Sequence, residues 1–380
     1  MAVSPQLLEV ARVFLTLGTT AFGGPAAHVA AMEDEVVTRR QWLSRDDFVD
    51  LVGAANLIPG PNSTELAIHL GYHRAGWAGL VVAGSCFLVP AVAIVWLCAM
   101  AYGRFGARVE VAAMLQGMQP AVLAVVVQAI WRLKGSLVRS RVGLVLAVLA
   151  FGGVLAGVSE LLLLLGAIVV ALSWAFWRAP DPGAPPALPM TVPLVAPMAV
   201  SIASAGATLG AASVFVSFLK IGSVLFGSGY VLLAFLRGEF VERFGVLSEG
   251  QLLDAIAVGQ VTPGPVFSTA TFVGYLLAGH AGAAAATAGI FLPAFAGVAL
   301  TAPLVRRLRT SPIASRALDA VNAVSLALMA SVVVLMARGI ALSVPSLAIL
   351  LGASLLLVRT SVGAGWVLLG GAVAGLLNLL

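Results

Sequence analysis

The chain contains the same segment twice, and this duplication constrains its fold more than any other feature. Residues 14–61 align with residues 218–265 without a gap, at an offset of 204, and 15 of the 48 aligned positions are identical. After a slip of one residue the match resumes at Gly71 and Gly274. The chain is therefore expected to form two similar units, and their shared glycines and prolines are residues that interrupt helices.

The apolar composition places both units in a membrane. Hydrophobic residues make up 61% of the chain and charged residues only 10%, whereas a soluble domain carries about 25% charged residues. The net charge of +5 fits basic loops beside membrane helices and requires no nucleic-acid partner. We predict an all-α polytopic membrane protein whose partner is the lipid bilayer, with no cleaved signal peptide. Stretches near the ~20 residues needed to span a bilayer are 77–102, 109–131, 161–177, 214–236 and 283–305.

A proline-rich segment divides the chain into two halves. Residues 178–189 contain five prolines, which forbid a helix and favour an extended connector. The predicted organisation is a first repeat with trailing helices at 1–177, a linker at 178–190, and a second repeat at 191–380. Both cysteines lie in one apolar stretch, so we expect no disulfide.

The basic loops indicate that the two repeats are inverted relative to each other. They lie after the helix at 109–131 in the first half and before the equivalent helix in the second, and cytoplasmic loops are enriched in Lys and Arg. Helices expected near 142–157, 159–177 and 190–207 give the odd number of crossings that inversion requires. A weaker basic loop at Arg104 and Arg108 competes with this assignment. The stronger loops contain Arg132, Lys134, Arg139 and Arg141, and Arg306, Arg307, Arg309 and Arg316.

Each repeat contains two helix breaks at matching positions. Pro59-Gly60-Pro61 and Pro263-Gly264-Pro265 each stop a helix, and Gly23-Gly24-Pro25 matches Gly227-Ser228-Gly229. Irregular backbone inside a membrane is tolerated only where protein or a wet cavity surrounds it. The helix that restarts there offers free N–H groups and a positive dipole end to an anion.

We therefore predict an anion site at the breaks; the alternative is that they are turns at the bilayer surface. The segments 10–37 and 46–72 are each either one kinked helix or a re-entrant pair. The predicted anion-binding residues are Gly23, Gly24, Pro25, Gly60, Asn62, Ser63, Thr64, Gly227, Ser228, Gly229, Gly264, Val266, Phe267, Ser268 and Thr269, together with Lys220.

Lys220 is the most unusual single residue. It lies within an apolar stretch and has no acidic neighbour within one helical turn. A lysine at the centre of a membrane helix costs about 2.5–3.5 kcal/mol, and the equivalent residue of the first repeat is Thr16. We predict that Lys220 faces the anion. The alternative is a lysine that extends to the lipid headgroups.

Glu65 follows the first Pro-Gly-Pro break and has two interpretations. With Asn62 as N-cap, Glu65 would complete a capping box. Beside an anion site, a carboxylate instead repels the ligand unless it is protonated, so Glu65 and His69, one turn on, are candidates for proton coupling. His69 and His73 have helical spacing but lack a third ligand, so no metal site is predicted.

Two ion pairs recur in the repeats. Glu35 and Arg39 correspond to Glu239 and Arg243, and glutamate four residues before arginine is the favourable helical pairing. We expect both pairs to brace the hairpins structurally; the alternative is a gate.

The motifs resemble the chromate ion transporter family in its long, two-domain form. The resemblance rests on four motifs in order, and it covers roughly 10–105 and 214–310. Ser228 replaces a glycine of the fuller family pattern. The motifs are Phe22-Gly23-Gly24-Pro25, Pro59 to Glu65, Phe218-Leu219-Lys220-Ile221-Gly222 and Thr262 to Val266.

This resemblance implies a secondary transporter that exports chromate from the bacterial cytoplasm across the inner (plasma) membrane and confers chromate resistance. Sulfate or another small anion is the alternative substrate. Helix N-termini and one lysine suit a tetrahedral oxyanion, and the membrane potential, with or without proton exchange, would drive efflux. No catalytic cluster indicates an enzyme, and no cofactor is expected. The small-residue stretch 282–289 permits close helix packing, and a homodimer is compatible with it.

Overall fold

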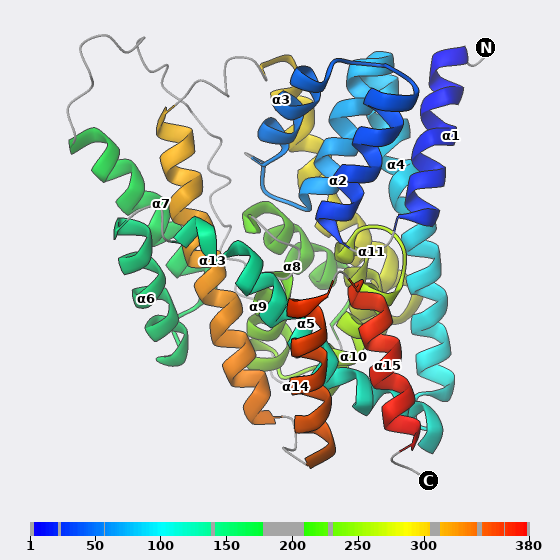
Figure 1. The fold of residues 1–380 in the computed structure, drawn as a ribbon, viewed down its shortest axis with the longest axis vertical. Helices are drawn as coiled ribbons and strands as arrows, with labels where there is room; N and C mark the ends of the chain where they lie inside the picture. Colours follow the sequence, from blue (N-terminus) through cyan, green and yellow to red (C-terminus); the bar gives the residue numbers. More distant parts are fainter. Residues whose placement is uncertain are drawn as a thin grey trace.

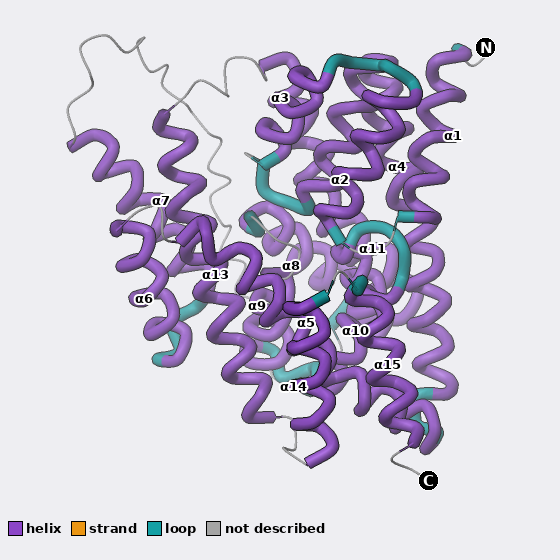
Figure 2. The backbone as a smooth tube through the Cα atoms, viewed as in Figure 1, coloured by secondary structure: helices purple, strands orange, loops and turns teal. Residues whose placement is uncertain are grey.

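The computed structural model is helical throughout the part of the chain that it describes. That part comprises residues 4–21, 24–56, 58–137, 141–177, 209–226, 231–304, 312–339, 344–360 and 362–377. Figure 2 shows these helices joined by short loops. Four described helices are long and apolar enough to cross a membrane. The expectation of an all-α membrane protein is confirmed, whereas the linker at 178–190 and the helix expected near 190–207 lie outside the described residues.

The first repeat begins with two short helices that meet at a break. α1 (Pro5–Thr20) starts at Ser4, whose side chain accepts a hydrogen bond from the Leu7 amide. Gly24 then adopts a positive φ of 81° and α2 (Pro25–Glu33) begins with proline in its first turn, where proline needs no N–H donor. A π-helical segment (Asp34–Arg39) continues α2. The segment 10–37 is thus a broken pair of helices.

A third short helix leads to the Pro-Gly-Pro break. α3 (Arg45–Ala55) is capped by Ser44, and α4 (Asn62–Phe105) begins directly after Pro61. The helical conformation of α4 is interrupted at Ala75 and Gly76, and Gly76 has a positive φ of 62°. A Cβ atom on Gly71 would overlap the Gly79 carbonyl, and one on Gly79 would overlap that of Gly71. α4 therefore folds back on itself as a helical hairpin, and its second arm runs to Phe105.

The second repeat follows the same order. α8 (Ala211–Val224), α9 (Leu232–Leu236), a π-helical segment (Arg237–Arg243) and α10 (Glu249–Val261) precede η4 (Val266–Ser268) and α11 (Thr269–Thr301). α11 is interrupted at Ala278 and Gly279, whose φ of 60° matches that of Gly76. The apolar stretch 214–236 contains two helices, since α8 ends at Val224 and α9 begins at Leu232; these ends flank the break predicted at Gly227-Ser228-Gly229, which lies outside the described residues.

The trailing helices are exchanged between the repeats. α5 (Val109–Leu137), α6 (Arg141–Leu155) and α7 (Glu160–Trp177) end the first repeat, and α13 (Pro312–Gly339), α14 (Val344–Arg359) and α15 (Ala364–Leu377) end the second. α6 and α7 pack on α13, while α14 and α15 pack on α5 (Figure 1). The two repeats are interleaved, and their apolar side chains share one large buried cluster.

Small residues allow the helices to approach closely. The stretch 282–289 lies on the second arm of α11, where Gly282 meets Gly274 of the first arm and Gly289 meets the Phe215 carbonyl of α8. Close packing in this stretch is confirmed, and it is packing within the chain.

Candidate functional site

Backbone hydrogen bonds join the breaks of the two repeats. The Gly60 N–H donates to the Leu225 carbonyl oxygen at 2.7 Å, and the Gly264 N–H donates to the Ala21 carbonyl oxygen at 3.0 Å. Gly60 and Gly264 are equivalent at the offset of 204, as are Ala21 and Leu225. Both glycines have positive φ, at 140° and 88°, a conformation that side chains make costly. Each Pro-Gly-Pro turn is thus held against the end of the first helix of the other repeat.

A cavity of about 320 Å³ lies beside the N-terminus of α4. Its polar side chains are Asn56 and Asn62, and the Asn62 Nδ2 donates to the Asn56 Oδ1 at 2.7 Å. The Asn62 Oδ1 is buried and has no hydrogen-bond partner among the described residues. No charged side chain is among those that line this cavity, which we call the α4 cavity: Pro25, Ala26, Val29, Val52, Ala55, Asn56, Asn62 and Leu66.

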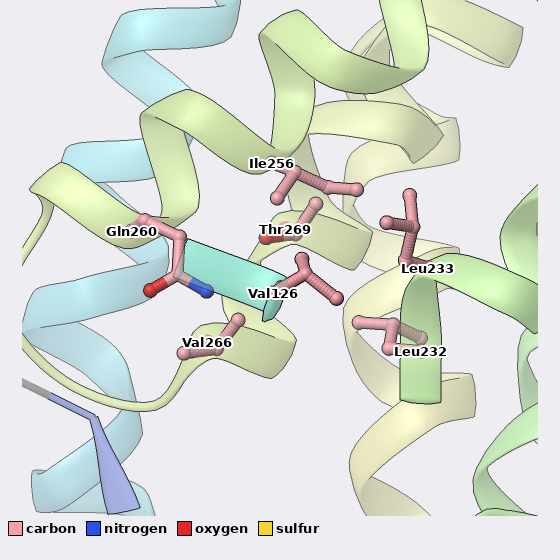
Figure 3. Close-up of a pocket in the computed structure, with 7 residues that line it drawn as sticks. All are labelled: Val126, Leu232, Leu233, Ile256, Gln260, Val266 and Thr269. Atoms are coloured by element: carbon pink, nitrogen blue, oxygen red, sulfur yellow. The ribbon is translucent and has the colours of Figure 1, made fainter. Parts of the chain in front are cut away.

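The equivalent place in the second repeat is nearly filled. There the cavity volume is about 10 Å³, about the space of one water molecule. Figure 3 shows Gln260 and Thr269 reaching this space from separate helices. Four of the residues that line it are equivalent to residues that line the α4 cavity. At three of these four positions the side chain in the second repeat is one methylene longer than in the first. The equivalent pairs are Val29 and Leu233, Val52 and Ile256, Asn56 and Gln260, and Asn62 and Val266.

Among the described residues, buried polar atoms without hydrogen-bond partners gather around both Pro-Gly-Pro turns. In the first repeat they belong to Thr64, Glu65 and His69, in addition to Asn62. An unsatisfied buried polar group costs about 1–3 kcal/mol, so such atoms indicate sites for water or a ligand. In the second repeat such atoms are Gln260 Nε2 before the turn, and Ser268 Oγ and Thr269 Oγ1 after it.

The capping box predicted for Asn62 and Glu65 is wrong. Pro61 occupies the N-cap position and Asn62 is already helical, so the Asn62 side chain cannot cap the helix. The Glu65 side chain is fully buried, and neither carboxylate oxygen has a partner in the described part of the chain. It lies against Gly60, where a Cβ atom would overlap Oε1. Proton coupling through Glu65 and His69 stays a prediction.

His28 belongs to the site and was not predicted from the sequence. Its ring is 1% exposed and lies between the end of α1 and the start of α4. Its Nε2 is 3.1 Å from the Ala21 carbonyl oxygen and its Nδ1 is 3.3 Å from the Ser63 Oγ. The one available signal was a histidine three residues after Pro25 in an otherwise apolar helix. The equivalent residue is Leu232, which lines the small cavity.

Lys220 has an acidic partner from another element. Its Nζ lies 2.6 Å from Glu239 Oε2, and its side chain is 28% exposed. Arg243 Nη1 contacts the other oxygen of Glu239 at 2.8 Å. Glu239 thus neutralises Lys220, and an anion would have to compete with this carboxylate. The role of Lys220 in anion binding stays a prediction.

A double substitution separates the two roles of Lys220. We expect Lys220→Met alone to lower anion transport, the activity that the sequence predicts, at least tenfold, because it leaves Glu239 buried with only Arg243 to offset its charge. If Lys220 serves only to neutralise Glu239, Lys220→Met combined with Glu239→Gln should restore most of the transport, since the buried carboxylate is removed as well and Arg243, 45% exposed, keeps access to water. Initial rates in proteoliposomes, normalised to protein content, measure this. A double variant as inactive as the single one would show that the ammonium group itself binds the anion.

The residues of both predicted ion pairs lie in contact, and both pairs lie in π-helical segments. Arg243 contacts Glu239 at 2.8 Å, and Arg39 Nη1 lies 3.6 Å from Glu35 Oε2. Glu35 also accepts a closer contact, at 2.7 Å, from Arg40. π-Helical turns are often found at functional sites, but a gating role for these pairs stays a prediction.

The remaining predicted residues are placed as follows. Pro25 lines the α4 cavity, and Val266, Phe267 and Ser268 are buried in η4. Gly23, Gly227, Ser228 and Gly229 lie outside the described residues. Within the described ranges, no group of three or more His, Cys, Asp or Glu side chains has the geometry to hold a metal.

The fold and the site define a class of protein. A multi-pass helical membrane protein built from two broken-helix repeats, with polar atoms gathered at the breaks, has the architecture of a secondary transporter. Comparison with known sequences makes this specific.

The chain belongs to the chromate transporter family. The family model, described as "Chromate transporter", matches twice, at residues 8–172 and 212–376, so each repeat is one copy of the family unit. The protein belongs to a family of transporters, not of enzymes.

Relatives cover most of the chain. It is 32% identical to the chromate transport protein of Cupriavidus metallidurans over 97% of this chain and 92% of the relative. It is 32% identical to the chromate transport protein of Pseudomonas aeruginosa, over 74% of this chain and 70% of that protein. The probable chromate transport protein of Synechococcus elongatus is 29% identical over 88% of this chain and 85% of its own length. No solved structure matches the chain.

Proposed function

We propose that this protein exports chromate across the bacterial inner membrane and binds the dianion in the α4 cavity. The observation that supports this most is the cavity itself, about 320 Å³ beside the N-terminus of a helix that restarts where the two repeats meet. The α4 cavity has room for a polyatomic anion, whereas the equivalent space in the second repeat, about 10 Å³, does not.

The chemistry of the α4 cavity suits a tetrahedral oxyanion. The first turn of α4 supplies N–H groups without intrahelical partners and a positive dipole end. Asn62 and Asn56 add side-chain amides, and rotation of either amide directs its NH₂ group into the cavity. Chromate shares its shape and charge with sulfate, so sulfate is the competing substrate to test.

The membrane potential gives the direction of transport. Moving one charge through 100 mV is worth about 2.3 kcal/mol, and a dianion gains about twice that amount on leaving an inside-negative cell. Export therefore needs no coupled cation, whereas uptake would need several.

Flux in proteoliposomes tests this proposal. We expect purified protein to move chromate faster toward the positive side when a potential is imposed, and excess sulfate, which has the same shape and charge, to compete with it. Equal rates at either polarity would contradict potential-driven export. Transport of sulfate without transport of chromate would assign the protein to the alternative substrate.

We further propose that the two repeats are inverted in the membrane. The reciprocal bonds from Gly60 to Leu225 and from Gly264 to Ala21 are the pattern that a twofold axis between the repeats would give. The exchange of trailing helices, with α6 and α7 on α13 and with α14 and α15 on α5, is reciprocal in the same way. Labelling of single cysteines from each side of the membrane tests this: equivalent loops of the two repeats should react from opposite sides.

Glu65 is the proposed proton carrier of the first repeat. Its carboxylate is fully buried, has no hydrogen-bond partner among the described residues and follows Asn62 by one turn, so its charge would act on an anion in the α4 cavity. Glu65→Gln should flatten the pH dependence of chromate flux and leave protein abundance unchanged, because Glu65 makes no cap that the substitution could break. The exposed Glu110 provides the control, since Glu110→Gln should retain the wild-type pH profile. A wild-type profile in Glu65→Gln would show that Glu65 carries no proton.

A further inference from the structure

A further buried carboxylate, besides those of Glu65 and Glu239, lies between the repeats and away from the α4 cavity. Asp254 of α10 is 7% exposed. Its Oδ2 accepts a hydrogen bond from the Tyr102 hydroxyl at 3.0 Å, and its Oδ1 accepts one from the Gln119 Nε2 at 3.1 Å. Tyr102 lies on the second arm of α4 and Gln119 on α5. One carboxylate of the second repeat is thus held by two helices of the first.

Asp254 has no basic partner in the described part of the chain. Arg237, on the π-helical segment that packs against α10, forms ion pairs with Glu249 at 2.8 Å and with Glu242. The other helices packed against α10 offer no nearby cation: α9, η4 and α15 have no titratable side chain. From α11, Phe272 packs edge-on against Tyr102, while Tyr275 and His280 contact each other. The basic residues of α4 and α5 nearest in sequence, Arg104 and Arg132, are exposed, as is Glu110.

Structure alone does not require an acid at this position. An asparagine would make the same two contacts, with Gln119 donating to its oxygen and Tyr102 accepting from its NH₂ group. It would also avoid the cost of burying a charge in a membrane protein. An acid that accepts hydrogen bonds from two neutral donors, with no basic partner among the described side chains, is suited to gain and lose a proton.

We propose that Asp254 is a second proton-binding site, separate from the α4 cavity and from Glu65. The carboxylate takes one proton from water and becomes a carboxylic acid, whose new O–H donates to the Tyr102 oxygen after the tyrosine hydroxyl rotates. Because a hydroxyl both donates and accepts, Tyr102 satisfies Asp254 in either protonation state.

Asp254 lies on the helix that leads to the second Pro-Gly-Pro turn, so its protonation can affect the helix breaks. α10 ends at the second Pro-Gly-Pro turn, where Gly264 binds the Ala21 carbonyl. Six residues along α10, about 9 Å at 1.5 Å per residue, Gln260 lines the small cavity with Thr269. The same helix thus connects the proton site to the breaks.

The test rests on the proposed function and compares two fluxes in proteoliposomes. The first is exchange of chromate for chromate at equal pH on both sides, which needs no net proton movement. The second is net chromate flux accelerated by an imposed pH gradient. We expect Asp254→Asn to keep exchange within about twofold of the wild-type rate and to lose the acceleration. Glu110→Gln is the control and should keep both.

A second variant, Tyr102→Phe, keeps the proposal testable if Asp254→Asn fails to fold. Tyr102→Phe removes one of the two donors and should keep coupling but shift the pH at which net flux is half-maximal. Gradient-driven acceleration that persists in Asp254→Asn, or a wild-type pH profile in Tyr102→Phe, would overturn the proposal for Asp254. Absence of chromate exchange in the wild-type protein would instead overturn the proposed function.

Discussion

Asn62→Asp is expected to abolish chromate transport without unfolding the protein. Asn62 is the first residue of α4 and lines the α4 cavity. Two unit charges about 4 Å apart repel by ~4 kcal/mol at an effective dielectric constant near 20, and a dianion doubles this. Even half of the total lowers affinity about a thousandfold. An acidic residue in the first turn also stabilises a helix, so the fold should be preserved. Chromate binding and flux on purified protein measure the effect.

Two further substitutions control for this result. Asn62→Ser introduces no charge and should therefore lower the affinity for chromate far less than Asn62→Asp. Val266→Asp places the same carboxylate at the equivalent position of the second repeat, beside the small cavity. If Asn62→Asp binds chromate like the wild type, the α4 cavity is not the anion site.

Gly71→Val should prevent stable folding. Gly71 and Gly79 bring the two arms of the α4 hairpin into backbone contact, and a Cβ atom on Gly71 would overlap both the Gly79 carbonyl and the Ala83 side chain. Overpacking a core costs about 1–3 kcal/mol and more where the obstacle is backbone. Thermal unfolding in detergent and the amount of monodisperse protein measure the loss.

Two other glycine substitutions serve as comparisons for Gly71→Val: Gly274→Val is the equivalent change in the second repeat, and Gly53→Ala is the control. Gly274 meets Gly282 and Ala286 in the equivalent hairpin of α11, so Gly274→Val should be as damaging. Gly53 lies in α3 with nothing within 4 Å of an added Cβ atom, so Gly53→Ala should be neutral or stabilising by up to ~1 kcal/mol. A Gly71→Val protein with the wild-type melting temperature would be incompatible with the hairpin.

The helix breaks were predictable because proline and glycine act locally. The Pro-Gly-Pro turns end α3 and α10 where the sequence indicates, and the recurring Glu239 and Arg243 form the expected pair. These features depend on residues within a few positions of each other, which a single sequence shows directly.

The features that were missed depend on contacts between distant segments. The partner of Lys220 is Glu239, 19 residues away and on another element, so a search within one helical turn does not find it. The hairpin turn at Gly76 has no proline to mark it, and the pairing of Gly71 with Gly79 becomes evident only when the arms meet.

Two other outcomes have local physical reasons. The capping box failed because Pro61 takes the N-cap position and shifts Asn62 into the helix, while a true capping box forms between Ser248 and Gln251. Asp254 had a sequence signal, since Asp50 is its equivalent in the first repeat, but its donors come from α4 and α5.

The position of chromium in the chromate-bound protein tests the central claim most directly. An anomalous difference map from crystals grown with chromate locates the metal atom without reference to the surrounding side chains. The anion site proposed here predicts one strong peak in the α4 cavity, within hydrogen-bonding reach of Asn62 and the first turn of α4. A peak beside Lys220 and Arg243 instead, with none in the α4 cavity, would contradict it.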